Sequence, residues 1–231
     1  MTASAIPAVR FSAHRPPVGL LAQRALADRP LDEVSRSGAR RNFTKGEELF
    51  AEGEAADFFY KVVSGTVRVC KLLSDGRRQI EAFQLAGDIF GLESGSEHRF
   101  TAEAVEDTVV LAFRRSRLAS LMHDNPAFGD HVMSSMIESL ERAQEHMVLL
   151  GRKTALEKMA TFLLDMSGRL AQGGSVELPM QRTDIADHLG LTIETVSRTL
   201  SQMVRDGLIK LAATGRTIVI SDKAALQALN G

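Results

Sequence analysis

The hydrophobic positions of residues 41–115 recur at short intervals and favour β-strands. Five stretches are rich in Val, Ile, Phe and Thr, and they read ELFAEG, FFYKVVSG, TVRVCKLL, RQIEAFQLAG and TAEAVEDTVVLAFR. Glycines separate these stretches, and Ser74-Asp75-Gly76 predicts a hairpin turn between two of them. Many short strands with regular turns are typical of an antiparallel sandwich or barrel.

The hydrophobic period becomes helical after residue 124. Asn125-Pro126 predicts the start of a helix, with an N-cap followed by proline at the first helical position. The helical rhythm continues to about Gly151, where we expect a hinge-like break before a second helix. Five positions spaced by intervals of four and three are typical of a coiled-coil seam, namely Met133, Ile137, Leu140, Gln144 and Met147.

This seam is too long for a small sandwich to cover. We therefore expect the helix to pair with the same helix of a second copy in a two-fold homodimer. The alternative is that the helix packs only on its own β domain.

Residues 184–200, DIADHLGLTIETVSRTL, contain two short amphipathic runs joined at Gly190-Leu191-Thr192. The first helix of a helix-turn-helix unit needs a small residue where the helices cross, and the turn needs a residue that tolerates positive φ. Ala186 and Gly190 meet these two needs, and Thr192 can cap the second helix. The following LIKLAATGRTIVISD predicts a hairpin, or wing, with its turn at residues 214–216.

Three polar side chains share one surface near the start of the second helix. Glu194, Ser197 and Arg198 are three and four positions apart. This end of a recognition helix enters the major groove, where Arg can bind guanine and Glu can accept from cytosine. The pattern predicts that these residues read base edges of duplex DNA. The alternative is an exposed ion pair between Glu194 and Arg198, worth about 0.2–0.5 kcal/mol.

Contacts to the DNA backbone are expected around this helix. Arg182 and Thr183 open the first helix, where amides and side chains often bind phosphate. The full predicted set is Arg182, Thr183, Thr192, Thr195 and Arg216. Lys210 either contacts phosphate or remains solvated.

Composition narrows the class of protein. The 231 residues are 44% hydrophobic and 25% charged, which is typical of a globular chain of one or two domains. No apolar run approaches the roughly 18 residues of a membrane span, and the N-terminus does not resemble a signal peptide. Residues 152–231 contain 10 Lys or Arg and 8 Asp or Glu, a net charge of +2, whereas the rest of the chain carries −3. This small asymmetry is weak support for a polyanionic partner.

Candidate chemistry outside the helix pair is sparse. The single cysteine, Cys70, excludes an intrachain disulfide and a cysteine metal site, and a reducing cytoplasm is the expected location. Cys70 lies in an alternating strand, so we expect it to be a buried apolar residue rather than a redox switch.

The six histidines form no HxH or HExxH motif, which makes a cupin-like metalloenzyme a remote alternative. Spacing alone does not exclude His123 or Met133 as haem ligands, but nothing favours them. We expect no enzyme activity.

The β-rich half, the long helix and the ETVSR helix-turn-helix together resemble the CRP/FNR family of transcription regulators, over about residues 30–231. LGLTIETVSRTLSQM is similar to the FNR and FixK branch, whose E-x-x-S-R signature is matched by Glu194, Ser197 and Arg198. GDIFGLESGSEHRFTAEAVEDT, residues 87–108, is similar to FixK proteins.

The resemblance implies a homodimeric activator that binds a TTGA-N6-TCAA-like palindrome and recruits RNA polymerase. Its genes would serve microoxic respiration, denitrification or nitrogen fixation. The half-site has one G·C pair, which suits one Glu and one Arg.

This sequence departs from the family pattern at the positions that would bind a cofactor or a small effector. One cysteine cannot supply the four ligands of an iron–sulfur cluster. The cyclic-nucleotide pocket of the family resembles G-E-L followed by R-S-A, and the counterparts here are Gly91-Leu92-Glu93 and Arg99-Phe100-Thr101. Because Phe100 cannot donate to a phosphate, we expect no bound nucleotide and no cofactor. The resemblance also implies action without a small effector. The alternative is a regulator whose β domain binds a nucleotide, haem or nitric oxide.

We therefore predict an α+β chain of four parts. These are a flexible arm (1–29), a cyclic-nucleotide-binding-like β-roll of jelly-roll type (30–122), a dimerisation helix (123–151) and a winged-helix DNA-binding domain (152–231).

Overall fold

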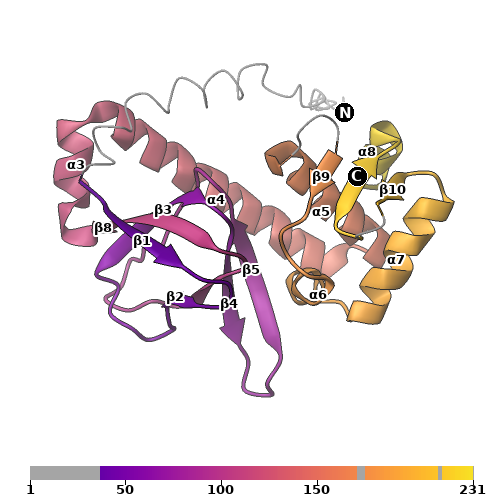
Figure 1. Cartoon of the computed structure of the whole chain (residues 1–231), viewed down its shortest axis with the longest axis horizontal. Coiled ribbons are helices and arrows are strands. Elements are labelled where there is room, and N and C mark those ends of the chain that lie inside the picture. The colour runs from indigo at the N-terminus through magenta and orange to yellow at the C-terminus, as the bar shows by residue number, and fades with distance from the viewer. Residues whose placement is uncertain (1–36, 171–174, 213–214, 231) are drawn as a thin grey trace, which may run out of the picture.

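The computed structural model describes residues 37–170, 175–212 and 215–230. Within these ranges a β sandwich and a smaller, mostly helical domain are joined by one long helix (Figure 1). The predicted arm, residues 1–29, lies outside the described residues. The α+β fold with a β-roll, a long helix and a winged helix-turn-helix is confirmed.

The β-roll consists of two antiparallel sheets among the described residues, ordered β1-β8-β3-β6 and β2-β7-β4-β5. Its core lies between the sheets and includes Val62, Val67 and Val110, which are fully buried. The strands are β1 (Ala39–Phe43), β2 (Glu48–Phe50), β3 (Phe58–Ser64), β4 (Val67–Leu72), β5 (Arg78–Gln84), β6 (Ile89–Phe90), β7 (Thr101–Ala104) and β8 (Thr108–Arg114).

Two features of the β-roll differ from the sequence pattern. The stretch TAEAVEDTVVLAFR forms two strands, β7 and β8, in different sheets, because the chain crosses between the sheets at Val105, whose N–H donates to Thr66 O (2.8 Å). Strand β1 pairs with β8 at the sheet edge, and its mostly exposed ARRNF sequence has no hydrophobic alternation that could have predicted it. The predicted hairpin between β4 and β5 is confirmed, with Gly76 at φ +84°.

The helices carry the C-terminal half of the chain. They are the 3₁₀ turn η1 (Arg115–Arg117), α3 (Leu118–Asp124), α4 (Pro126–Arg152), α5 (Ala155–Leu170), α6 (Arg182–Leu189), α7 (Ile193–Arg205) and α8 (Lys223–Asn230). Helix α4 begins directly after Asn125, as the Asn125-Pro126 signal predicted, because this residue before proline is extended and its side chain accepts from Phe128 N (3.0 Å). The first residues of the dimerisation segment expected over 123–151 therefore belong to the end of α3. The break expected at Gly151 falls two residues later, between α4 and α5. No described helix is long and apolar enough to span a lipid bilayer.

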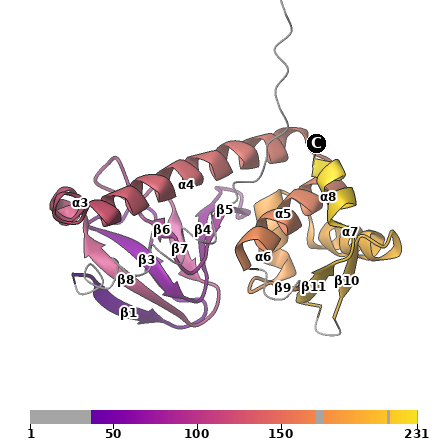
Figure 2. The ribbon, with the colours of Figure 1, turned by 90° about the horizontal axis from the view of Figure 1, so that it is seen from above.

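Helix α4 contains 27 residues, which corresponds to about 40 Å. Its first turns bury Phe128 and Val132 against the β-roll, and its end buries Leu149 in the C-terminal core. Figure 2 shows α4 running along one side of the molecule, from α3 beside the β-roll to the C-terminal domain. Its middle part is mostly exposed, although His146 reaches α6, where its Nε2 lies 2.8 Å from His188 O.

The C-terminal domain folds as predicted around the two short helices. Val196, Leu200 and Met203 of α7 are buried, and Ala186 of α6 lies at the helix crossing with 4% exposure. Strands β10 (Ile209–Leu211) and β11 (Thr217–Ile220) form the wing, although Thr214 of its predicted turn lies outside the described residues. Strand β9 (Ser175–Glu177), which the sequence did not suggest, adds to β11 and completes a three-stranded sheet.

Gly190 ends α6 in the left-handed conformation that the turn requires (φ +61°, ψ +43°). A Cβ atom here would also lie 3.2 Å from Leu150 Cδ2 of α4. We expect Gly190→Ala to lower the free energy of unfolding by about 1–2 kcal/mol, because L-residues are strained in this conformation.

Chemical denaturation followed by circular dichroism measures this effect. Gly168→Ala is the matched control, because this exposed glycine lies inside α5 and its Cβ would meet no atom within 4 Å. The control should raise stability by about 0.5–1 kcal/mol. Equal stability of the two variants would contradict the role given to Gly190.

Candidate nucleic-acid interface

Helix α7 is held at its start by hydroxyl groups. Thr192 is its N-cap, and its Oγ1 accepts from Thr195 N (3.2 Å) and lies 3.0 Å from Thr195 Oγ1. The predicted capping role of Thr192 is therefore confirmed. Thr192 is exposed and Thr195 is half-buried, so solvent can reach the first turn of α7, where both hydroxyls lie.

The three predicted base-reading residues lie on one side of this helix. Glu194 and Arg198 are exposed, and Ser197 is half-buried. Within the described ranges Glu194 forms no ion pair with Arg198, whose Nη2 instead donates to Thr195 Oγ1 (3.3 Å). The ordinary i, i+4 ion pair that could explain these residues is thus absent from this part of the chain. Both charges face solvent and can meet other groups.

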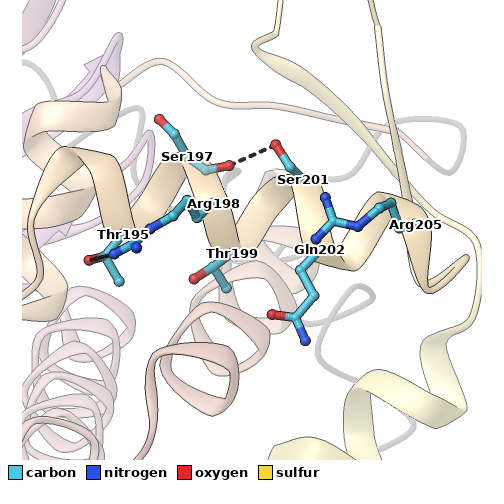
Figure 3. A pocket seen from close by; sticks show the side chains of 7 residues that line it. All are labelled: Thr195, Ser197, Arg198, Thr199, Ser201, Gln202 and Arg205. Atoms are coloured by element: carbon cyan, nitrogen blue, oxygen red, sulfur yellow. Dashed lines mark hydrogen bonds between the residues drawn. The ribbon is translucent and has the colours of Figure 1, made fainter.

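A hollow of about 570 Å³ runs along α7. Figure 3 shows the side chains that line it, spread from one end of the helix to the other. They are Thr195, Ser197, Arg198, Thr199, Ser201, Gln202 and Arg205. Ser201, Gln202 and Arg205 were not among the predicted contacts, although they continue the spacing of three, four and seven residues from Arg198. This helical spacing from Arg198 is the sequence signal that could have predicted them.

A second hollow, of about 230 Å³, lies between the wing and the start of α6. It brings together two predicted phosphate contacts, Arg182 and Arg216. Arg182 Nη1 donates to Ser197 Oγ (3.2 Å), and a Cβ on Gly215 would lie 3.4 Å from Arg182 Nη2. Arg182 therefore links α6, α7 and the wing.

The remaining predicted backbone contacts are also accessible. Thr183 is exposed in the first turn of α6, where free amides favour an anion, and Lys210 is exposed on β10. The first turn of α6 is closed by a capping box in which Gln181 N donates to Asp184 Oδ2 (3.1 Å). Cations, amides and hydroxyls thus surround the exposed side of α7, an arrangement that can bind a phosphate backbone on either side of a base-reading helix.

The middle of α4 exposes a continuous apolar strip. Its predicted seam residues are all exposed, with Leu140 at 59% and Met147 at 68%. The strip comprises Met133, Met136, Ile137, Leu140, Gln144, Met147 and Val148. Most of its side chains are apolar and none is buried in the chain, which argues against the alternative that α4 serves only its own β domain.

In the β-roll, two of the residues that correspond to the family's nucleotide pocket form an ion pair with each other. Arg99 Nε donates to Glu93 Oε2 (3.0 Å), and the Glu93 side chain is only 9% exposed. Phe100 is half-buried and packs against the core of the roll, with Lys71 Nζ 5.9 Å from its ring centroid. Within the described residues, no group of three or more His, Cys, Asp or Glu could hold a metal ion.

Cys70 is buried, as predicted, with 3% exposure. Burial, with a smaller contribution from the neighbouring Glu103 carboxylate, raises the pKa of its thiol to about 11. We expect Cys70 to react slowly with a disulfide reagent at pH 8 in the folded protein and rapidly in denaturant, because the attacking species is the thiolate.

The same shift gives a pH dependence. Folding favours the neutral thiol, so the contribution of Cys70 to stability is complete below pH 9.0 and is lost as pH rises towards about 11. Equal reaction rates in native and denatured protein at pH 8 would contradict this description of Cys70.

Comparison with known proteins matches both halves of the chain. Residues 40–125 match the cyclic nucleotide-binding domain, and residues 157–229 match the Crp-like helix-turn-helix domain. The nitrogen fixation regulation protein FixK of Azorhizobium caulinodans is 44% identical over 207 residues, which cover 87% of this chain and 83% of that protein. The chain belongs to the CRP/FNR family, in its FixK branch.

Two further FixK proteins support this placement. The nitrogen fixation regulation protein FixK of Rhizobium meliloti is 41% identical over 86% of this chain and 92% of that protein. The structure of FixK2 from Bradyrhizobium japonicum superposes with a TM-score of 0.79, at 47% identity, over 84% of this chain and 98% of the other. These CRP/FNR relatives are regulators rather than enzymes, which confirms the expectation that this chain is not an enzyme.

Proposed function

We propose that this chain is a sequence-specific DNA-binding transcription regulator, mainly an activator, that acts as a homodimer on a TTGA-N6-TCAA-like palindrome. The observation that carries the proposal is the exposed side of α7, where Glu194 and Arg198 face solvent without pairing with each other. Predicted phosphate contacts surround this surface, which is the arrangement that a recognition helix needs.

Base reading follows from the chemistry of the three side chains. Arg198 supplies a planar pair of donors for guanine O6 and N7, and Glu194 accepts from a cytosine amino group. Ser197 already accepts from Arg182, so its hydroxyl proton remains available for a base or a phosphate. One guanine and one cytosine per half-site suit the single G·C pair of TTGA.

Phosphate binding is assigned to the residues around the helix. Arg182 and Arg216 lie beside the wing, and Thr183 lies in the first turn of α6. Thr192 and Thr195 lie at the start of α7. These contacts fix the register of the protein on DNA but do not select sequence.

The homodimer is assigned to the apolar strip of α4. Residues 123–151 would pair with the same segment of a second copy, so that the two α7 helices meet half-sites whose centres are about 10 base pairs apart. The domain division proposed from the sequence, with a β-roll over 30–122 and a DNA-binding domain over 152–231, fits this role.

The biological role follows from the relatives. Two of them are named nitrogen fixation regulation proteins, and we propose that this chain likewise controls genes of nitrogen fixation or of microoxic or anaerobic respiration. Such a regulator acts in the cytoplasm, where it contacts RNA polymerase through surface loops.

We further propose that the β-roll acts without a bound nucleotide, haem or other cofactor. The position that would need a phosphate donor is Phe100, and Glu93 is occupied by Arg99. Calorimetry with cyclic AMP should show no binding heat, and a visible spectrum of the purified protein should show no haem band. A saturable binding isotherm would instead favour the effector-responsive alternative.

Transcription in vitro tests the whole proposal. Purified protein and RNA polymerase are mixed with a template that carries the palindrome upstream of a weak promoter, and with a template whose half-sites are scrambled. We expect transcript from the first template alone to increase with protein. Binding to the palindrome without any increase in transcript would contradict the assignment as an activator.

A further inference from the structure

Ion pairs and hydrogen bonds join the DNA-binding domain to the β-roll. The structure assigns Arg68 and Arg78 of the β4–β5 hairpin as positioning residues that set the orientation of the helix-turn-helix unit and thereby the half-site spacing that the dimer accepts. This inference rests on the proposed palindrome recognition.

Two arginines of the β-roll meet two carboxylates of α6. Arg78 Nη2 donates to Asp184 Oδ1 (2.7 Å), and Arg78 Nε donates to Asp187 Oδ2 (2.9 Å). Arg68 Nη1 donates to the same Asp184 oxygen (3.1 Å), and its Nε donates to Glu103 Oε2 of β7 (2.5 Å). These five residues form an ion cluster that joins the two domains.

The cluster is well shielded from water. The Asp184 side chain is 5% exposed, and those of Arg68 and Arg78 are 18% and 25% exposed. Charge pairs at such sites are screened less than surface pairs, and loss of one partner leaves a buried charge unmatched. Asp184 is also the N3 residue of the capping box of α6 and accepts from Gln181 N, so the arginines hold the first turn of the helix that presents Arg182 and Thr183.

Backbone contacts and apolar packing continue the interface. Gln79 Nε2 donates to His188 O (3.1 Å), and His188 Nδ1 donates to Ile80 O (3.1 Å). Ile80 and Phe83 of β5 belong to the same buried cluster as the α5 and α6 core. Burial lowers the pKa of His188 to about 3, so this contact keeps its hydrogen-bonding pattern at neutral pH. The hairpin therefore supports α6 through side-chain, backbone and apolar contacts.

This docked arrangement leaves the DNA-reading side open. The hairpin covers Asp184, Asp187 and the His188 backbone, whereas Glu194 and Arg198 remain exposed. The contact is therefore compatible with DNA binding rather than an obstruction to it.

Orientation matters because the palindrome has two copies of the half-site. Adding one base pair to the spacer rotates the second half-site by about 35° relative to the first. Only two residues, Lys153 and Thr154, link α4 to α5. With the ion cluster intact, the dimer should bind tightly at a single distance between the half-sites. With the cluster broken, the DNA-binding domains should reorient and also bind half-sites at other distances.

The test measures affinity for duplexes with four, six and eight base pairs between TTGA and TCAA. We expect wild-type protein to prefer six, and Arg78→Gln to reduce the ratio of six-pair to eight-pair affinity by about five- to tenfold. Arg78→Lys should retain most of the preference. Arg77→Gln is the matched control, because within the described part of the chain the Arg77 side chain pairs with exposed Asp75 at the hairpin tip and not with α6. Should Arg78→Gln not fold, Asp187→Asn removes the other side of the contact at a less buried position, with the same expected change.

Three outcomes overturn the inference. An equal fall in affinity at every spacing would show that the cluster only stabilises the fold. Tighter binding at every spacing would show that the docked arrangement restrains DNA binding. An unchanged spacing preference in Arg78→Gln and Asp187→Asn would show that other contacts set the orientation. Wild-type protein that binds no palindrome at all would instead overturn the proposed function, and the inference with it.

Discussion

Leu140→Glu is expected to separate the dimer and to weaken binding to the palindrome at least about a hundredfold. Leu140 is 59% exposed near the centre of the apolar strip of α4. In a two-fold pair the introduced carboxylates would lie close to each other in an apolar seam, where burial of an unpaired charge is costly. A single chain reaches only one half-site and loses the gain from binding both together.

Light scattering and a fluorescence anisotropy titration measure the two effects on the same samples. Glu145→Gln is the control, because Glu145 is exposed on α4 but lies outside the seam. The control should remain dimeric with unchanged affinity. A Leu140→Glu variant that stays dimeric and binds as tightly as wild type would show that the strip serves another purpose.

Arg198→Ala is expected to cost about 1–3 kcal/mol for each half-site and to relax the choice at the G·C pair. Arg198 is exposed, and among the described residues its guanidinium donates to Thr195 Oγ1 alone (3.3 Å), so its other donors can turn to a guanine. Affinity for TTGA half-sites should fall, whereas affinity for duplexes with another base pair at that position should change little.

A modified base separates base reading from phosphate binding in this experiment. Replacing the guanine by 7-deazaguanine removes the N7 acceptor, so it should weaken wild-type binding and hardly affect Arg198→Ala. Arg205→Ala is the comparison, because Arg205 lies on the same hollow at the far end of α7 and is expected to meet phosphate. It should weaken all sequences alike and lower the salt dependence of binding. Equal sensitivity of both variants to the modified base would contradict the role of Arg198.

Local signals in the sequence predicted most of the helix-turn-helix geometry. Gly190, Ala186 and Thr192 each meet a requirement of geometry at one position, and the structure has them as expected. Asn125-Pro126 located the start of α4 for the same reason. Where the backbone geometry at one position requires a particular residue type, that residue in the sequence predicts the geometry.

Long-range features were not predictable in this way. Strands β1 and β9 form because neighbouring strands offer free edges, and their own residues show no alternation. The ion cluster joins Arg68 and Arg78 to Asp184, which lies more than 100 residues further along the chain. Hydrophobic periodicity locates strands and helices but does not reveal which charged residues meet across a domain boundary.

A titration of the purified protein with two duplexes of identical composition tests the central claim, that two copies of α7 read base edges. One duplex carries TTGA-N6-TCAA, and in the other the half-sites are scrambled. We predict saturation at two chains per palindromic duplex and an affinity at least about a thousandfold above that for the scrambled duplex. Equal affinities, or saturation at one chain per duplex, would contradict the claim.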